Sequence, residues 1–377
     1  MTARILIIAG SDSGGGAGIQ ADIRTVTMLG GHAMTAVTAI TAQNTLGVTA
    51  VHSVPADMVI AQMRACLDDI GVDAVKIGMI GSAATAHAVA DVLHSEGRGT
   101  PIVFDPVMIA TSGSILADED TIAAFDRLMR LATLVTPNLP ELAALGGEEA
   151  VLATGASLLV KGGHAEGDTI TDRLLGAAGE IARWSAPRID TPHTHGTGCT
   201  LASAIAEGLG RGLPLPQAVE RARRFVRIAL REAPGLGHGH GPMGHHKVRL
   251  DVDLGGATPN HVTLPATDHA ASLAFYTALG LTPIVDSAGR YARFESAGGT
   301  TLSIEAAEEI AGKPLVFLEV ADLDAAVAAA RAHGIEVANP VDQSWGWREA
   351  RLADPTGNPL CLYTADEHRR FPPWRLS

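Results

Sequence analysis

The sequence predicts an α/β domain, built on a mostly parallel sheet flanked by helices, followed by a smaller α+β domain. From residue 1 to about residue 232, short apolar runs alternate with longer segments of helical period, which is typical of consecutive βαβ units. Most of the short runs are continuously apolar, as expected for strands buried on both faces. From Lys247 onward the units become shorter and are separated by turn-forming stretches such as residues 287–289 and 297–299. A chain of 377 residues also exceeds what one hydrophobic core usually supports, so two domains are expected.

The elements of the first domain follow from this alternation. The last predicted helix begins after Pro214, a position where proline is tolerated. We expect strands at residues 4–9, 34–41, 74–77, 102–104, 134–136 and 157–160. We expect helices at residues 18–29, 56–70, 84–95, 119–131 and 215–232.

A stretch rich in glycine, proline and histidine joins the two domains. Residues 233–246 lack the periodicity of a helix or a strand, because glycine and proline interrupt them throughout. Four histidines in this stretch suggest a metal site, but nothing fixes their geometry, so a solvated linker is favoured. The expected boundaries are residues 1–246 for the first domain, with 233–247 as its tail and linker, and residues 250–377 for the second.

The composition excludes some classes of partner. The 28 Lys and Arg against 41 Asp and Glu give a formal net charge of −13, and no basic run is interleaved with aromatic residues, so nucleic acid is not expected to bind. The apolar run before Gly10 is too short for a signal peptide or a membrane span, which predicts a cytoplasmic protein with no membrane partner. Cys66, Cys199 and Cys361 have no paired spacing, which indicates neither a disulfide framework nor a zinc site.

The segment His195-Gly196-Thr197-Gly198-Cys199 is the most informative motif in the chain. It leads into a helical pattern of small apolar residues, and glycines let its backbone N–H groups converge on an anion at the helix start. We expect the guest to be a phosphoryl group. The pKa of the Cys199 thiol is expected to fall at this helix start, where its sulfur can accept a proton. The alternative is an ordinary Gly-rich helix entry with a small buried cysteine.

Other polar residues follow the predicted strands, and the carboxyl ends of such strands are where α/β proteins gather functional groups. The loop at residues 10–18 resembles a dinucleotide fingerprint, but Gln43 and Asn44 follow the second strand in place of the acid that would bind a ribose. A P-loop is also excluded, because no Gly-Lys-Ser/Thr closes the loop. We therefore expect a loop whose backbone comes close to a small substrate and covers it. The amide of Gln43 matches a heteroaromatic ring with an amino group beside a ring nitrogen, although a turn-favouring Gln-Asn pair is an equally good interpretation.

Two carboxylates and a lysine complete this edge of the sheet. Asp105 and Glu141 are candidate Mg²⁺ ligands through water, and Lys161 is a candidate contact for a donor phosphate. Each carboxylate alone is more often a helix cap or a surface charge. Together with the anion cradle, the set favours phosphoryl transfer.

These motifs resemble the hydroxymethylpyrimidine and phosphomethylpyrimidine kinases of thiamine biosynthesis, a family of the ribokinase-like superfamily. The resemblance covers residues 1 to about 246. It implies ATP-dependent phosphorylation of 4-amino-5-hydroxymethyl-2-methylpyrimidine and then of its monophosphate, with a homodimer expected by analogy with the superfamily. The matching segments are residues 9–22, 41–45, 76–79, 105–108, 136–138, 160–164 and 194–200.

The resemblance also implies roles for individual residues. Cys199 stands where related sugar kinases have a catalytic Asp and becomes the candidate base, and the amides of Gly196, Thr197, Gly198 and Cys199 would stabilise the transferring phosphoryl. Gln43 would recognise the aminopyrimidine. The pocket and nucleotide residues implied are Gly10, Ala17, Asp22, Met79 and Val107 for substrate, Lys161, Asn138 and Thr197 for ATP, and Asp105 and Glu141 for Mg²⁺.

One departure from the family pattern concerns the nucleotide side. The segment between Glu141 and Lys161 is short, with only residues 148–154 available for a helix, so ATP binding or the second phosphorylation is expected to be weaker. A pyridoxine-type kinase is the close alternative, because its substrate is also a hydroxymethyl heteroaromatic ring. A pyrimidine-phosphate sensor with its chemistry in the second domain is the other.

The second domain contains an internal repeat. Residues 260–281 and 315–335 each form a strand, a helix and a turn, and with residues 354–360 they resemble the vicinal oxygen chelate superfamily of glyoxalases, extradiol dioxygenases and bleomycin-resistance proteins. This implies paired βαβββ units over about residues 257–366. The metal positions of the superfamily fall on His261, on Ser303 or Glu305, on Leu315 and on Cys361. Leucine binds no metal, so a metal-free small-molecule-binding domain is favoured over a metalloenzyme. Trp345 and Trp347 are candidates to line its pocket, or else core residues.

Overall fold

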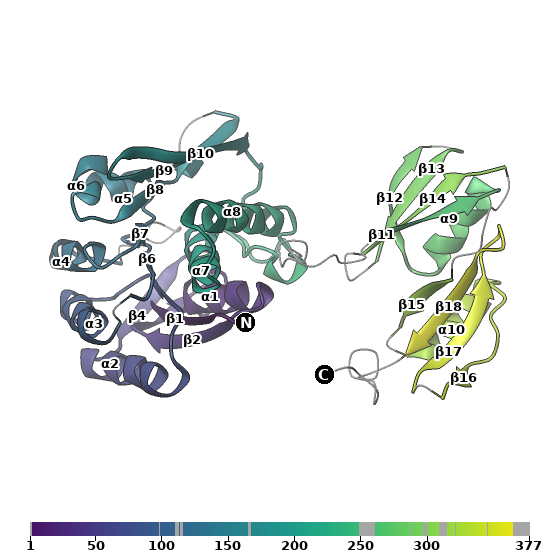
Figure 1. The fold of residues 1–377 in the computed structure, drawn as a ribbon, viewed down its shortest axis with the longest axis horizontal. Coiled ribbons are helices and arrows are strands. Elements are labelled where there is room, and N and C mark those ends of the chain that lie inside the picture. The colour runs from purple at the N-terminus through teal and green to yellow at the C-terminus, as the bar shows by residue number, and fades with distance from the viewer. Residues whose placement is uncertain are drawn as a thin grey trace. The chain divides into compact units, whose positions relative to one another are not determined.

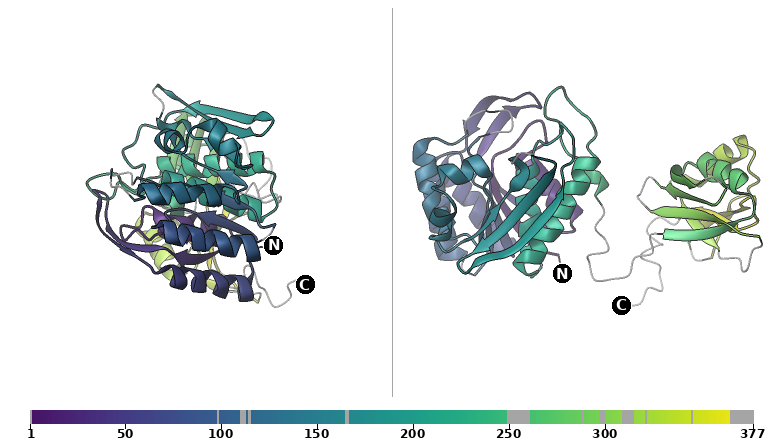
Figure 2. Two further views of the ribbon diagram at one scale, coloured as in Figure 1. Left: turned by 90° about the vertical axis from the view of Figure 1, so that its left-hand side faces the viewer. Right: turned by 90° about the horizontal axis from the view of Figure 1, so that it is seen from above.

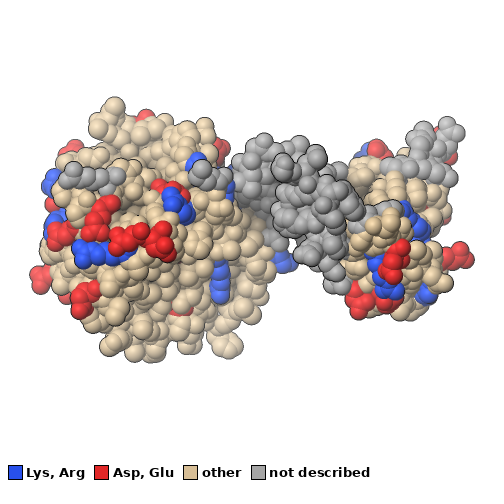
Figure 3. Space-filling view, turned by 60° about the horizontal axis from the view of Figure 1, so that its bottom comes forward, with Lys and Arg blue, Asp and Glu red and all other residues tan. Residues whose placement is uncertain are grey.

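The computed structural model divides the chain into two compact units, residues 1–250 and 251–377. No described helix is long and apolar enough to cross a membrane. On the face in Figure 3, acidic and basic side chains lie beside one another rather than in separate patches. The structure describes residues 2–97, 99–109, 113, 116–164, 167–248, 261–287, 289–296, 300–308, 315–320, 322–344 and 346–364.

An eight-stranded sheet forms the centre of the first unit, in the order β10-β9-β8-β7-β6-β5-β1-β2. The pairs β2–β1, β1–β5, β5–β6, β6–β7 and β7–β8 are parallel, whereas β9 is antiparallel to both β8 and β10. The predicted mostly parallel sheet is therefore confirmed. Its strands are β1 (Arg4–Ala9), β2 (His32–Val37), β5 (Ala74–Ile77), β6 (Ile102–Phe104), β7 (Leu134–Val135), β8 (Ser157–Val160), β9 (Thr169–Gly176) and β10 (Gly179–Pro187).

Helices cover both faces of this sheet (Figures 1 and 2). Successive residues of β1 enter different cores: Leu6 and Ile8 pack toward α2, α3 and α4, while Ile5 and Ile7 pack toward α1, α7 and α8. This two-sided burial explains the continuous apolar run of the strand. The helices are α1 (Gly18–Met28), α2 (Ala56–Ala65) with a π-helical extension at Cys66–Ile70, α3 (Ala83–Glu96), α4 (Glu119–Met129), α5 (Leu139–Ala144), α6 (Glu148–Leu152), α7 (Thr197–Gly210) and α8 (Leu215–Arg231).

The segment predicted as one strand at residues 34–41 is instead two. The chain turns at Thr38, whose N–H donates to the Ala9 carbonyl at 3.1 Å and whose hydroxyl donates to the Met79 carbonyl at 2.6 Å. After the turn, β3 (Ala39–Gln43) leaves the main sheet and pairs with β4 (Val48–Ser53). The β9–β10 hairpin was also absent from the prediction, because β10 is a largely exposed edge strand and not an apolar run.

The solvated-linker interpretation of residues 233–247 is wrong for the second half of that stretch. Met243 and Val248 are buried in the core beneath α8, and His245–Lys247 forms a short 3₁₀ turn. The Nε2 atom of the buried His245 lies 2.8 Å from the hydroxyl oxygen of Thr200 in α7. The tail therefore packs on the first unit. Apolar side chains at Met243 and Val248 were the available signal.

The second unit is a pair of βαβββ repeats, as the internal repeat predicts (Figure 1). The two helices begin alike: Asp268 accepts from the Ala271 N–H at 2.9 Å, and Asp322 from the Ala325 N–H at 3.0 Å. The first repeat is β11 (His261–Ala266), α9 (His269–Ala278), β12 (Thr282–Ser287), β13 (Tyr291–Glu295) and β14 (Thr301–Ala306). The second is β15 (Val316–Glu319), α10 (Leu323–Ala332), β16 (Val341–Asp342), β17 (Arg348–Ala353) and β18 (Pro359–Thr364).

Candidate active site

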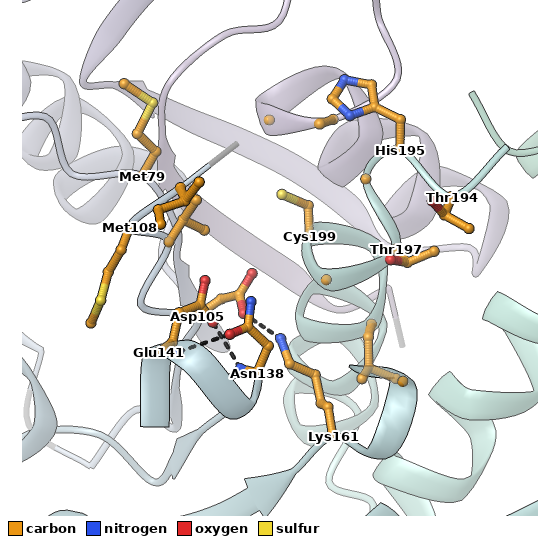
Figure 4. Close-up of a pocket in the computed structure, with 18 of the residues that line it drawn as sticks. Met79, Asp105, Met108, Asn138, Glu141, Lys161, Thr194, His195, Thr197 and Cys199 are labelled. Carbon is orange, nitrogen blue, oxygen red and sulfur yellow. Dashed lines mark hydrogen bonds and ion pairs between the residues drawn. The ribbon is translucent and has the colours of Figure 1, made fainter. Parts of the chain in front are cut away.

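A cavity of about 830 Å³ opens in the first unit at the carboxyl ends of the parallel strands (Figure 4). It brings together nearly all the residues singled out in the sequence, although they are up to 189 positions apart, from Gly10 to Cys199. The predicted residues that line it are Gly10, Ala17, Gln43, Met79, Asp105, Val107, Asn138, Glu141, Lys161, Gly196, Thr197, Gly198 and Cys199.

The predicted anion cradle is the N-terminus of α7. Gly196 is the residue before the helix, with a φ of +83°, and its carbonyl accepts the Thr200 N–H at 2.9 Å. A Cβ at Gly196 would overlap the carbonyl of Gly16, and a Cβ at Gly16 would lie 2.5 Å from the His195 ring. The two glycine loops thus pack backbone against backbone. Because the first N–H groups of a helix have no acceptor within it, this end of α7 favours an anion in the cavity.

Asp12 organises the first of these loops, and the sequence analysis gave it no role. Its carboxylate accepts the N–H groups of Gly14, Gly16 and Ala17 at 2.8–2.9 Å and lies 2.9 Å from the His195 Nε2 atom. Burial raises the pKa of Asp12, but these hydrogen bonds outweigh burial and hold its pKa below the usual range. Asp12 therefore links the loop at residues 10–18 to His195, which directly precedes Gly196 at the start of α7.

Gln43 faces the cavity from the end of β3. Its Nε2 atom lies 3.2 Å from the His195 Nε2 atom, and its Oε1 atom lies 3.3 Å from the Thr41 hydroxyl oxygen. The Thr41 hydroxyl donates its proton to the nearer acceptor, the Ser11 carbonyl, at 2.8 Å. These contacts hold the Gln43 amide in a fixed place at the wall, where it presents polar atoms to a planar ring.

An ion pair lies against the start of α7. The Lys161 Nζ atom is 3.0 Å from the Asp105 Oδ1 atom, which also accepts the Thr136 hydroxyl at 3.0 Å. A Cβ at Gly198 would be 3.4 Å from both the Lys161 Nζ and Asp105 Oδ2 atoms. Burial lowers the pKa of Lys161, but the neighbouring carboxylates of Asp105 and Glu141 raise it overall, so the ammonium stays charged beside the cradle.

Asn138 and Glu141 form a reciprocal cap at the start of α5. The Asn138 side chain accepts the Glu141 N–H at 2.9 Å, and the Glu141 carboxylate accepts the Asn138 N–H at 2.8 Å. Both side chains also line the cavity. Burial raises the pKa of Glu141 to about 7. Carboxylate oxygens are the ligands Mg²⁺ prefers, so Asp105 and Glu141 fit a water-bridged Mg²⁺, with Lys161 between them and the helix end.

Asp22 is the predicted substrate residue that the structure places elsewhere. It is completely buried below the cavity, which it does not line, and its carboxylate pairs with the Lys76 Nζ atom at 2.8 Å. A direct contact with substrate is therefore wrong for Asp22. Lys76 does border the cavity, although in the sequence it stands out only as part of the motif at residues 76–79.

Cys199 points into the cavity from the first turn of α7 (Figure 4). The expected fall in its pKa is wrong: burial raises the pKa of the thiol to about 11, with further increases from Asp22 and Asp105, and Lys76 and the Gly18 N–H only partly oppose them. Desolvation of the thiolate therefore outweighs the favourable dipole of the helix N-terminus at this position. Because Cys199 is only partly buried by its exposed area, the alternative of a small buried cysteine at a helix entry is partly correct.

In the second unit, fewer of the candidate site residues come together. At the superfamily's metal positions, Ser303 is buried and its hydroxyl oxygen lies 2.7 Å from the Tyr291 hydroxyl, Glu305 is exposed, and Cys361 is buried. Among the described residues no group of three or more His, Cys, Asp or Glu could hold a metal. The His261 side chain and Trp345 lie outside the described residues, while Trp347 stacks on Tyr363 with ring centroids 4.7 Å apart.

Two family models match separate parts of the chain. Residues 12–244 match the family described as phosphomethylpyrimidine kinase, and residues 258–362 match the glyoxalase/bleomycin resistance protein/dioxygenase superfamily. A hydroxymethylpyrimidine/phosphomethylpyrimidine kinase of Rhizobium meliloti is 48% identical over 262 residues, which cover 65% of this chain and 97% of that protein.

Solved structures give the same fold for the first unit. A pyridoxal kinase of Bacillus subtilis, solved as an ADP complex, superposes with a TM-score of 0.59 at 31% identity, over 65% of this chain and 98% of that one. A phosphomethylpyrimidine kinase of Clostridium difficile superposes with a TM-score of 0.52 at 34% identity, over 60% and 98% of the two chains.

Proposed function

Because the chain belongs to the phosphomethylpyrimidine kinase family, we propose that it phosphorylates 4-amino-5-hydroxymethyl-2-methylpyrimidine with ATP and then phosphorylates the resulting monophosphate. The observation that carries this proposal is the convergence of Gln43, Cys199 and the Asp105–Lys161 pair on one cavity at the start of α7. A ring held at Gln43 has its hydroxymethyl group directed toward the thiol, and a donor phosphate has the helix end and an ammonium to bind.

Each residue then has a part in the transfer. Cys199 takes the proton of the substrate hydroxyl, and the amides of Gly196, Thr197 and Gly198 stabilise the phosphoryl group as charge builds up on its oxygens. Lys161 contacts the donor phosphates as a point charge. Gly10, Ala17, Met79 and Val107 line the cavity, and we assign them to the apolar walls around the ring. Asn138 and Thr197 also line it and are assigned to the nucleotide.

Mg²⁺ belongs to the proposal as the partner of ATP. Asp105 and Glu141 would hold it through water, and the ion would supply charge neutralisation at the donor phosphates. Ion binding favours the ionised form of Glu141, which burial alone disfavours.

The rest of the chain is assigned on the same basis. We assign the kinase domain to residues 1–246 and a glyoxalase-like domain that binds a small molecule without a metal to residues 250–377. The dependence on ATP fits an enzyme of the cytoplasm that needs neither nucleic acid nor a membrane as partner. A homodimer is the proposed assembly, which sedimentation of the full chain tests directly.

Mass spectrometry of products tests the activity. The full chain is incubated with Mg-ATP and the hydroxymethylpyrimidine, and the diphosphate is the expected product. Monophosphate alone would restrict the enzyme to the first step and assign the defect to the short segment between Glu141 and Lys161. No product would favour a pyrimidine-phosphate sensor.

A pyridoxal-type kinase is the second candidate. It is favoured by one observation: the first unit superposes on the Bacillus subtilis pyridoxal kinase over 98% of that chain. The same incubation with pyridoxal and pyridoxine in parallel distinguishes the two, because a higher kcat/KM for either vitamer than for the pyrimidine would reverse the assignment.

A further inference from the structure

A buried ion pair lies directly below the cavity and has no part in the function proposed above. Lys76 in β5 donates to the Asp22 carboxylate of α1 at 2.8 Å, and the Ser203 hydroxyl of α7 donates to the other oxygen of that carboxylate at 2.7 Å. All three side chains are 0% exposed. Burying two charges is unfavourable even when they are paired, so this arrangement does not by itself explain why a lysine stands here.

The geometry relates this pair to Cys199. Cys199 and Ser203 are four residues apart on α7 and therefore lie on one face of the helix, one turn apart. Of the ion pair, Lys76 borders the cavity floor together with Cys199, whereas Asp22 lies below it. A Cβ at Gly78 would be 2.6 Å from the Lys76 Nζ atom, so a glycine leaves the space into which the ammonium extends.

We propose that Lys76, held by Asp22 and Ser203, is a positioning residue that stabilises the thiolate of Cys199. The step rests on the proposed function: the substrate hydroxyl gives its proton to the sulfur as its oxygen bonds to the γ-phosphorus, and the bond from that phosphorus to ADP breaks. Lys76 stays protonated throughout and acts through the sulfur by its charge alone.

The charges around the thiol support this assignment. Lys76 lowers the pKa of Cys199, whereas burial, Asp22 and Asp105 raise it, and the charge of Cys199 in turn acts on Lys161. The pKa of Lys76 is raised by Asp22, Cys199 and Asp105 despite its burial, so the ammonium keeps its proton at neutral pH. Lys76 is thus the cation whose charge favours the thiolate of Cys199, and both residues line the same cavity.

The test measures the thiol itself and needs no substrate. The rate at which iodoacetamide alkylates Cys199 is followed against pH by mass spectrometry of its peptide in the full chain. Lys76→Met removes the charge and keeps the length of the side chain, and we expect alkylation at pH 8 to slow about tenfold or more, because only the thiolate reacts. Ser203→Ala is the matched control, since it removes one hydrogen bond to Asp22 without changing a charge. The pH dependence of Cys199 alkylation in this variant is expected to stay that of the parent.

Kinetics with the pyrimidine give the second readout. Lys76→Met is expected to lower kcat while leaving both KM values within about twofold, as a residue acting only in the chemical step does. If that variant does not fold, Lys76→Gln removes the same charge, leaves Asp22 unchanged and keeps a neutral hydrogen-bond donor for its carboxylate, so it carries the same test.

An unchanged alkylation profile in a folded variant that lacks the Lys76 charge would overturn the proposal and leave the pair a structural one. A shifted profile in a protein that phosphorylates neither ring would support the electrostatic role and reject the proposed function, so the two failures are distinguishable.

Discussion

Gly196 and Gly16 are in backbone contact, with no room for a Cβ on Gly196. One belongs to the cradle before α7 and the other to the loop after β1, 180 positions earlier in the chain. Because each loop shapes the other, the loops proposed to bind the phosphate and the substrate form one structural unit.

Gly196→Ala tests that contact. The φ of +83° disfavours any side chain, and the new Cβ would also displace the Gly16 carbonyl, so we expect a loss of about 1–3 kcal/mol of stability and a large fall in kcat. Gly212 has the same φ but no atom within 4 Å of its Cβ position. Gly212→Ala is therefore the control, and equal loss of activity in both variants would mean that strain alone explains the effect. Thermal unfolding and steady-state kinetics supply the two measurements.

Cys199→Ala is expected to lower kcat by about 10²–10⁴-fold, because it removes the proton acceptor and leaves the cradle intact. Cys66→Ala is the matched control, since that partly buried thiol lies in the π-helical extension of α2, outside the cavity. Near-normal turnover of the Cys199 variant would remove the thiol from the proposed chemistry. Phosphorylation of the pyrimidine at saturating ATP is the measurement.

Gln43→Ala is expected to raise the KM for the pyrimidine by about 10–100-fold, since a ring that has lost its partner leaves buried polar atoms unsatisfied. The KM for ATP should not change. Asn44→Ala provides the comparison: that side chain accepts the Leu46 N–H at 2.9 Å within its own loop and does not line the cavity. A rise in KM shared by both variants would indicate a loop defect.

Glu141 makes the stability of the first unit depend on pH. Its folded pKa of about 7 lies above the usual value of 4.5, so the folded state binds the proton more tightly, and stability is lost as the pH rises from about 4.5 to 7. Glu141→Gln should remove a change in stability of about 3 kcal/mol over that range, measured by urea unfolding against pH. The exposed Glu149 is the control position, where Glu149→Gln should keep the parent pH dependence. A parent slope retained in Glu141→Gln would refute the assignment.

Asp354 joins the two halves of the second unit. Its carboxylate accepts the Tyr276 hydroxyl at 3.1 Å and the Asn358 side-chain amide at 2.7 Å, both buried. Tyr276→Phe should lower the stability of this unit by about 1–2 kcal/mol, because a buried carboxylate loses a donor. Thr277→Ala, at an exposed hydroxyl one residue on, should have a smaller effect in calorimetry of the full chain.

The main features of the fold followed from the sequence because burial on two faces leaves a plain signal. Ile5, Leu6, Ile7 and Ile8 form an uninterrupted apolar run, and the structure divides them between two cores. The split at Thr38 was missed because a hydroxyl bonded to a distant carbonyl, not a glycine or proline, turns the chain there.

Site residues could be predicted where the residue type alone determines the local backbone. They could not be predicted where a side chain's role depends on a partner distant in the sequence. Gly196 and Gly198 were identified because only glycine gives such a backbone. The contact between Asp12 and His195 joins positions 183 apart, so the local sequence pattern around either residue does not indicate it. The pKa of Cys199 went in the opposite direction from the expected one, since the extent of burial belongs to the folded molecule.

The tail has a consequence for synthesis on the ribosome. The His195 N–H donates to the Gly241 carbonyl at 3.3 Å, and Met243 and His245 are packed beside α7 and α8, so residues near position 245 help to close the structure around the cradle. A nascent chain folds from its N-terminus, and it reaches the end of α8 before these contacts exist. The kinase unit therefore matures only when its last residues leave the exit tunnel, by which time translation of the second unit is under way.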